Sequence, residues 1–259
     1  MQIKILGCSG GIGAELRTTS MLVDQDILID AGTGVGNLSM DELLKIDHIF
    51  LTHSHLDHIA FLPFLLDTVM GIRAEPINVY ANKETLETLR LHIFNWKVWP
   101  DFNAIPSTDN PFLRYCEVKL SETLELNGRK FTPLPANHVV PAIGYHVDSG
   151  AASLVFTGDT TVCDELWHEV NKIKNLKYLI IETAFSNSEL ALAQLSKHLC
   201  PSLLRSQLVK LITHDATPSL EIYITHLKPG EGESIMQEIA ESHSAFVIQA
   251  LKQQQEFYL

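Results

Sequence analysis

The chain has 259 residues, of which 46% are hydrophobic and 19% are charged, and its formal net charge is −12. This is the composition of an ordinary globular protein that is long enough to build a sizeable core. The acidic balance argues against long nucleic acids, whose binding rests on Lys and Arg contacts to phosphates, and it favours a small anionic substrate.

Hydrophobic runs and cysteines set two further limits. No apolar run reaches the roughly 20 residues that cross a bilayer, so we expect no membrane partner. Residues 1–7 read as a strand entering a turn rather than a signal peptide, which favours a cytoplasmic location, with a removed export signal as the alternative. The cysteines Cys8, Cys116, Cys163 and Cys200 are widely spaced with no CxxC pair, which predicts reduced thiols.

The first half of the chain alternates short apolar strands with helices. Strands are predicted at 2–6, 21–23, 27–29, 49–51 and 77–80, with the second and third as a hairpin that ends at Asp30. Helices are predicted at 41–45, at 59–69 and after Asn82, whose side chain can cap a helix. The glycine-rich turn at 7–13 fits neither the dinucleotide nor the P-loop fingerprint, so by itself it indicates a loop.

An aromatic passage follows the helix that Asn82 starts. Trp96, Trp99 and Phe102 lie in it, and their spacing favours simple packing against the helix end. The alternative is a lid that offers a flat face to a base or ring.

The second half continues the alternation. Strands are predicted around 115–120, 130–134, 144–147, 153–157, 177–181, 221–224 and 245–248. Helices are predicted at 164–173, from about 188 with His198 near its end, at 201–210 and once more before the last strand. This alternation indicates an α/β fold, and the lack of a linker or a composition shift predicts a single domain over residues 1–259.

Residues 52–58, Thr-His-Ser-His-Leu-Asp-His, are the strongest chemical signal. His53 and His55 alternate in an extended segment and therefore share a face, while a turn into a helix would bring Asp57 and His58 to a second point nearby. The segment could thus serve two adjacent cations. Nitrogen and oxygen ligands without sulfur suit zinc, and also manganese, iron or cobalt.

Other polar residues follow predicted strands at the point where each strand ends. They are Asp30, Asp159, Glu182 and His226. Ligands of open α/β sheets gather at such carboxyl ends. Residues 49–53 and 222–226 also look alike, which suggests two related halves packed face to face.

Asp30, the His53-x-His55-x-Asp57-His58 segment, His138, Asp159 and His226 resemble, in that order, the five motifs of the metallo-β-lactamase superfamily. The resemblance spans nearly the whole chain and implies a four-layer αβ/βα sandwich with a binuclear metal site at the sheet edge. Within the superfamily the chain is most similar to the class II 3′,5′-cyclic-nucleotide phosphodiesterases. Residues 52–59, 94–102, 181–185, 197–199 and 224–229 carry this second similarity.

The resemblance implies a role for each motif residue. His53, His55 and His138 correspond to the ligands of one metal ion, Asp57, His58 and His226 to those of the other, and Asp159 to the bridging carboxylate. Asp30 corresponds to an aspartate that orients a ligand histidine. The cofactor would be two divalent ions, with Zn²⁺ favoured over Mn²⁺ or Fe²⁺. Trp96, Trp99 and Phe102 become a candidate substrate wall, and the glycine-rich turn is expected beside the site.

The expected chemistry is hydrolysis of a cyclic nucleotide, cAMP or cGMP. A hydroxide held between two metal ions would attack the phosphorus and expel the 3′-oxygen, leaving a nucleoside 5′-monophosphate. Asp57, Glu182 and His198 are the residues expected to take part in catalysis, with His198 as general acid or phosphate contact and Glu182 orienting it. Taken alone, His198 near a helix end is equally well explained by packing.

Three other functions stay open at this point. An RNA endonuclease like the tRNA 3′-processing enzymes would share the ligands but would need a basic arm, which the sequence lacks. A thioester or β-lactam hydrolase would use the same hydroxide on a carbonyl. A non-catalytic metal-binding protein is the third alternative, against which the intact ligand set argues. The expected partner is a small cyclic nucleotide, and a homodimer is an open alternative to a monomer.

Overall fold

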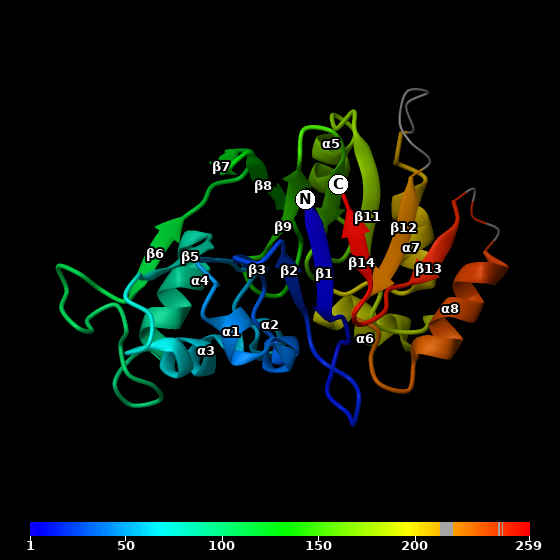
Figure 1. The fold of residues 1–259 in the computed structure, drawn as a ribbon. Coiled ribbons are helices and arrows are strands. Elements are labelled where there is room, and N and C mark those ends of the chain that lie inside the picture. The colour runs from blue at the N-terminus through cyan, green and yellow to red at the C-terminus, as the bar shows by residue number, and fades with distance from the viewer. Residues whose placement is uncertain (213–219, 243, 245) are drawn as a thin grey trace.

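The computed structural model describes residues 1–212, 220–242, 244 and 246–259. Two seven-stranded sheets form the centre of the molecule (Figure 1). In spatial order, the first sheet consists of β14 (Glu256–Tyr258), β1 (Gln2–Gly7), β2 (Ser20–Val23), β3 (Ile27–Ile29), β4 (His48–Phe50), β5 (Ile77–Ala81) and β6 (Leu113–Glu117). The second consists of β13 (Ile248–Ala250), β12 (Glu221–Thr225), β11 (Leu176–Glu182), β10 (Ser153–Phe156), β9 (Ile143–Asp148), β8 (Arg129–Pro135) and β7 (Leu124–Leu126).

Helices pack against the outer face of each sheet. The first sheet carries α1 (Met40–Leu43), α2 (Leu56–Ile59), α3 (Leu62–Val69) and α4 (Lys83–Thr88), and the second carries α5 (Asp164–Val170), α7 (Pro201–Leu208) and α8 (Gly232–Glu241). The remaining helix, α6 (Leu190–Ser196), lies at the edge of the sheets and buries Ala193 in a small separate cluster. Within the described residues, no helix is long and apolar enough to cross a membrane. The layers are therefore helix, sheet, sheet, helix, which confirms the predicted αβ/βα sandwich.

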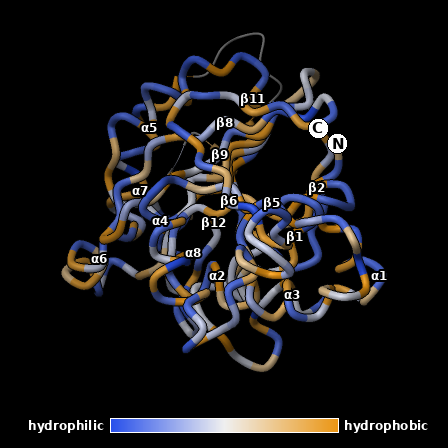
Figure 2. The backbone as a smooth tube through the Cα atoms, turned by 90° about the vertical axis from the view of Figure 1, so that its left-hand side faces the viewer, coloured by the Kyte–Doolittle hydropathy of each residue, from blue (hydrophilic) through white to orange (hydrophobic). Residues whose placement is uncertain are grey.

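Three apolar clusters hold these layers together. The middle cluster lies between the two sheets, and one lies between each sheet and its helices. In the middle cluster, Phe50 of the first sheet stacks on Phe131 of the second at a centroid distance of 4.4 Å. Such a ring pair contributes about 0.5–1.5 kcal/mol beyond its buried area. Figure 2 shows the corresponding hydrophobic stretches along β8, β9 and β11.

Strand direction explains where a site can form. β3, β4, β5 and β6 run parallel to one another, and so do β10, β11, β12 and β13. Parallel strands end at the same edge of a sheet, and ligands bind at such edges. In Figure 1, α2 and α6 lie at the lower edge, below the sheets.

The structure corrects several predicted elements. The helix expected at 59–69 is two helices, because the amide of Phe61 donates to Ala31 O at 2.9 Å instead of continuing the helical ladder. His198 lies beyond the end of α6 rather than within it, because Lys197 adopts a left-handed conformation that stops the helix. β7 and β14 were not expected, and β14 pairs with β1 so that the two termini meet. The last predicted strand begins at residue 245, outside the described residues, and β13 lies at Ile248–Ala250.

Candidate metal centre

Seven side chains from distant parts of the chain converge at this edge. His53 follows β4, His55 caps α2, and Asp57 and His58 lie in its first turn. His138 comes from the loop between β8 and β9, Asp159 follows β10, and His226 follows β12.

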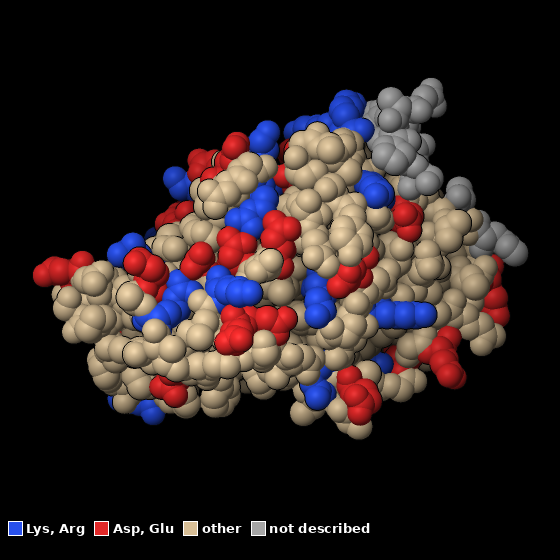
Figure 3. Space-filling model, in the orientation of Figure 1, with Lys and Arg blue, Asp and Glu red and all other residues tan. Residues whose placement is uncertain are grey.

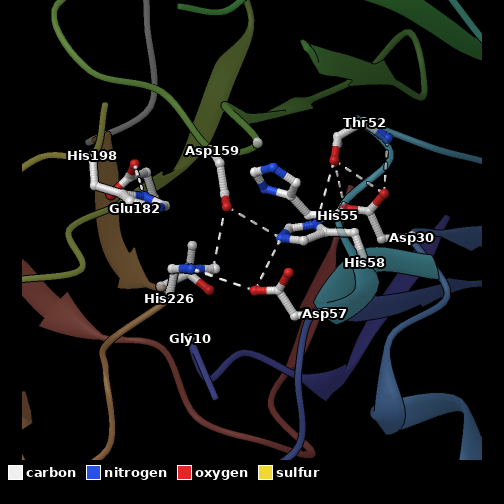
Figure 4. Close-up of polar contacts among 12 residues, drawn as sticks. Gly10, Asp30, Thr52, His55, Asp57, His58, Asp159, Glu182, His198 and His226 are labelled. Atoms are coloured by element: carbon white, nitrogen blue, oxygen red, sulfur yellow. Dashed lines mark hydrogen bonds and ion pairs between the residues drawn. The ribbon is translucent and has the colours of Figure 1, made fainter. Parts of the chain in front are cut away.

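The seven side chains form two ligand groups. His53, His55, His138 and Asp159 make the first ligand group, and Asp57, His58, Asp159 and His226 make the second. Within each group the ligand atoms all lie within 4.8 Å of one another. Asp159 belongs to both groups, and Figure 4 shows its carboxylate between His58 and His226. This is the grouping implied by the resemblance, and the assignment of individual metal ligands stays a prediction.

The ring nitrogens are placed as metal ligands would be. His138 Nε2 lies 3.1 Å from His55 Nδ1, about the separation of two nitrogens that each lie ~2.0–2.1 Å from one zinc ion. His53 Nε2, His58 Nε2 and His226 Nδ1 are buried and have no hydrogen-bond partner. Each of these three nitrogens lies 3.3–3.7 Å from a carboxylate oxygen of Asp159. Buried polar atoms are normally satisfied, so three orphaned nitrogens around one carboxylate fit a pair of divalent cations.

Asp30 and Thr52 hold two of the ligand histidines in orientation. His58 Nδ1 lies 2.7 Å from Asp30 Oδ2, which leaves Nε2 facing the cluster. The hydroxyl of Thr52 donates to Asp30 and lies 3.0 Å from His53 Nδ1, so it can accept the proton of that ring. Asp30 takes a left-handed φ of 58°, which Asp tolerates better than most residues. Sequence reasoning found Asp30 but missed Thr52, for which the only signal was a hydroxyl residue directly before the first histidine.

Burial keeps several of these histidines neutral. Burial, followed by the neighbouring His58, holds the pKa of His53 well below its ordinary value. Burial lowers the pKa of His138 to about 4 and that of His226 to about 3. A neutral imidazole is the form that binds a metal ion, so these shifts favour ligand function.

The carboxylates create an opposing negative field. Burial alone would lower the pKa of His58, but Asp159 and Asp30 outweigh it and raise this pKa well above the ordinary value. Burial would raise the pKa of Asp159, but His226 and His58 outweigh it and hold this pKa well below its usual range. Asp159 is therefore ionised, and its charge attracts a cation to the middle of the cluster.

Glu182 and His198 lie beside the ligand groups. His198 Nδ1 donates to Glu182 Oε1 at 2.8 Å, and Glu182 also accepts from the amides of Thr160 and Leu199. The ring of His198 lies 4.9 Å from that of His138 and is stacked 5.1 Å from that of His226. His198 is thus part of the site, with Nε2 left for other partners.

The glycine-rich turn reaches the site from β1, as expected. Gly10 N donates to Leu227 O at 3.0 Å, and Lys228 Nζ donates to Gly10 O at 2.7 Å. A Cβ at Gly10 would lie 2.4 Å from His226 O and 2.8 Å from His226 Cδ2. Only glycine allows this close approach to the last ligand of the second group.

The predicted aromatic wall is wrong for Phe102. Its ring is 1% exposed and packs between Phe94 and Phe112 in the core, so it cannot face a substrate. Trp99 packs edge-on against Phe64 of α3 at 5.3 Å. Trp96 is 64% exposed, and its role at a substrate stays a prediction.

The chain matches a known family over most of its length. The profile of the beta-lactamase superfamily domain matches residues 25–246. A Yersinia pestis protein described as "Probable 3',5'-cyclic-nucleotide phosphodiesterase" is 28% identical over 206 residues, which cover 71% of this chain and 58% of that protein. A ribonuclease Z of Clostridium beijerinckii is 32% identical over 157 residues, covering 56% of this chain and 48% of that protein. The chain thus spans about half the length of these relatives.

The fold has close counterparts among solved structures. Unliganded yeast PDE1 superposes with a TM-score of 0.80 at 19% identity, covering 100% of this chain and 99% of that one. At this identity the likeness concerns the fold alone. Together with the family match over residues 25–246, it shows that this chain belongs to the metallo-β-lactamase superfamily.

Proposed function

We propose that this chain is a metal-dependent phosphodiesterase that opens the cyclic phosphate of 3′,5′-cyclic nucleotides to give nucleoside 5′-monophosphates. The Glu182–His198 pair beside the two ligand groups carries the phosphodiesterase part of the proposal, and the description of the Yersinia pestis relative supports the cyclic-nucleotide part. A sugar alkoxide is a poor leaving group and needs a proton, and a held imidazole can supply one.

Each part of the site has its own role in the proposed reaction. The two ligand groups would hold two divalent ions, with zinc favoured, and such ions supply Lewis acidity and an activated water. Glu182 fixes His198 through Nδ1, so that Nε2 can donate its proton to the 3′-oxygen as the P–O bond breaks. Because the ligand histidines His53, His58 and His226 are buried, bulk water is largely excluded from this side of the site.

Charge supports a small substrate over a polymer. Lys and Arg intermix with Asp and Glu on the face in Figure 3, which shows no continuous basic surface. Two lysines adjoin the site, but the Nζ of Lys197 is bonded to Asn137 and His138, and that of Lys228 to Gly10. Both ammonium groups are thus engaged by neighbouring oxygens of the chain. The description of the Yersinia pestis relative supports the same substrate class.

An RNA endonuclease of the ribonuclease Z type is the second candidate. The observation that favours it is the 32% identity to the Clostridium beijerinckii enzyme. The Glu182–His198 pair would serve an RNA phosphodiester equally well, because its leaving group is also a sugar alkoxide.

One comparison of substrates tests both candidates. Zinc-loaded protein is assayed on cAMP, cGMP, bis-p-nitrophenyl phosphate and a precursor tRNA, with His55→Ala and a chelator-treated sample as controls. We expect turnover of a cyclic nucleotide to the 5′-monophosphate, lost in both controls. Cleavage of the precursor tRNA without cyclic-nucleotide turnover would replace the proposal by the second candidate. Turnover of the artificial diester alone would reject both.

A further inference from the structure

Lys197 is built into the site without belonging to either ligand group. It follows α6 directly and has φ 53° and ψ 50°, a left-handed conformation that residues other than glycine rarely adopt. Glycine is the usual residue at this place after a helix. We therefore expect a lysine at this position to contribute through the contacts of its side chain.

The side chain and the backbone carbonyl of Lys197 both contact His138. His138 Nδ1 lies 3.1 Å from Lys197 O, and Lys197 Nζ donates to His138 O at 3.2 Å and to Asn137 Oδ1 at 3.1 Å. The ammonium thus reaches across to the loop between β8 and β9 rather than back to the carbonyls of α6. A lysine that merely stabilised the helix end would do the reverse.

Hydrogen bonds from Asn137 also hold the His138 loop against the turn that follows β10. The backbone amide of Asn137 donates to Thr160 Oγ1 at 2.9 Å, and Asn137 Nδ2 donates to Val162 O at 2.9 Å. This turn follows Asp159, the carboxylate common to both ligand groups. Lys197 is therefore bonded to the His138 loop, and this loop is in turn bonded to the turn after Asp159.

We propose that Lys197 is a positioning residue that sets the tautomer and place of His138 in the first ligand group. A proton on Nδ1, donated to Lys197 O, leaves the lone pair on Nε2, which points toward His55 Nδ1. A hydrogen bond from the second ring nitrogen commonly fixes a ligand histidine in this way. The ammonium holds the loop so that this bond can form. The proposal depends on metal binding by the cluster and not on which diester is cleaved.

Two substitutions remove the ammonium and leave the backbone carbonyl of residue 197 in place. Lys197→Met keeps the backbone and the stem but removes the donors, and Lys197→Gly also removes the strain of the left-handed backbone. Lys172→Met is the matched control, since the Nζ of Lys172, just after α5, donates to Glu169 in an exposed ion pair away from the site. The chelator-stripped proteins are titrated with Zn²⁺ by calorimetry, and ring ¹H–¹⁵N spectra report the tautomer of His138.

We expect both Lys197 variants to lose about 10- to 100-fold in affinity at one of two zinc sites, the range seen when a partner of a ligand is removed. The His138 ring should then show mixed tautomers, and Lys172→Met should bind as wild type. If Lys197→Met does not fold, the zinc affinity and the His138 tautomer of Lys197→Gly test the proposal instead. Two sites of wild-type affinity and a single His138 tautomer in the variants would overturn this proposal while leaving the proposed function intact. A wild-type protein that binds no zinc would overturn both.

Discussion

Glu182 and His198 are 16 positions apart, yet the imidazole of His198 donates to the buried carboxylate of Glu182 at 2.8 Å. Burial alone would lower the pKa of His198, but the charge and hydrogen bond of Glu182 outweigh it and raise this pKa. A raised pKa keeps the ring protonated to higher pH, as a proton donor requires.

Glu182→Gln should therefore weaken the donor. Without the negative charge the pKa of His198 falls, so the alkaline limb of the kcat profile should move to lower pH, and kcat above this limb should drop. The measurement is kcat against pH with saturating cyclic nucleotide. Glu87→Gln, which alters an exposed pair with Lys83, serves as control. An unmoved alkaline limb would remove Glu182 from this role.

His198→Ala should affect substrates according to their leaving groups. Loss of a general acid costs about 100- to 10,000-fold when the leaving oxygen needs a proton. We expect that loss for a cyclic nucleotide and a much smaller one for bis-p-nitrophenyl phosphate, whose phenolate leaves unprotonated. Zinc content is measured in parallel. Near-normal cyclic-nucleotide turnover with both metal ions bound would exclude His198 from the mechanism.

Asp30→Asn should weaken metal binding without touching a ligand. The amide cannot replace the carboxylate that accepts from both His58 and Thr52, so His58 loses its fixed orientation. We expect about 10- to 100-fold lower zinc affinity at one site, measured by calorimetry. Asp41→Asn, in the exposed first turn of α1, should leave affinity unchanged. Equal affinities in the two variants would contradict the orienting role.

Gly10→Ala should displace the last ligand. The added methyl would lie 2.4 Å from His226 O, so the turn or His226 must move. We expect about 1–3 kcal/mol of destabilisation, typical of overpacking, together with lower zinc occupancy. At Gly13 the nearest atom is the flexible end of Leu16 at 3.2 Å, so Gly13→Ala is the matched control. Urea denaturation and metal analysis compare the two, and equal results would show that the turn yields easily.

Arg129→Met should reduce stability in a pH-dependent way. Arg129, in β8 of the second sheet, pairs with Asp26 in the hairpin turn of the first, with Nη2 to Oδ2 at 2.8 Å. This hydrogen bond is the main reason why the pKa of Asp26 is lowered. A lowered folded pKa gives stability that is present above the unfolded pKa, about 4, and lost as the pH falls through the folded value.

We therefore expect Arg129→Met to lower the free energy of unfolding by about 1 kcal/mol at pH 7, a modest figure because Asp26 is partly solvated. The difference from wild type should shrink near pH 3. Lys130→Met changes the exposed neighbour on the same strand and should have little effect at either pH. A difference that is constant with pH would show that packing, rather than the ion pair, is lost.

Local sequence patterns predicted the α/β class and the strand ends that meet at the site, whereas the four-layer sandwich and the ligand role of His138 were implied by the family resemblance. The apolar strands that end in Asp30, His53, Asp159 and His226 could be located from the sequence, and their parallel arrangement makes those ends meet at one edge. The alternation of residues 53 and 55, followed by a helix, likewise predicted the split of one segment between two ligand groups, which the structure shows.

Tertiary structure alone decided which neighbours support or exclude each side chain. The contact between Lys197 and His138 joins residues 59 positions apart, and the Thr52 hydroxyl acts through Asp30, 22 positions away. Phe102 lies in an aromatic passage that suggests a substrate wall, but its side chain is buried in the core of the folded chain. Periodicity reports the direction of a side chain along its own element. Its partners depend on how the elements pack, and that is settled by long-range burial rather than by neighbours in sequence.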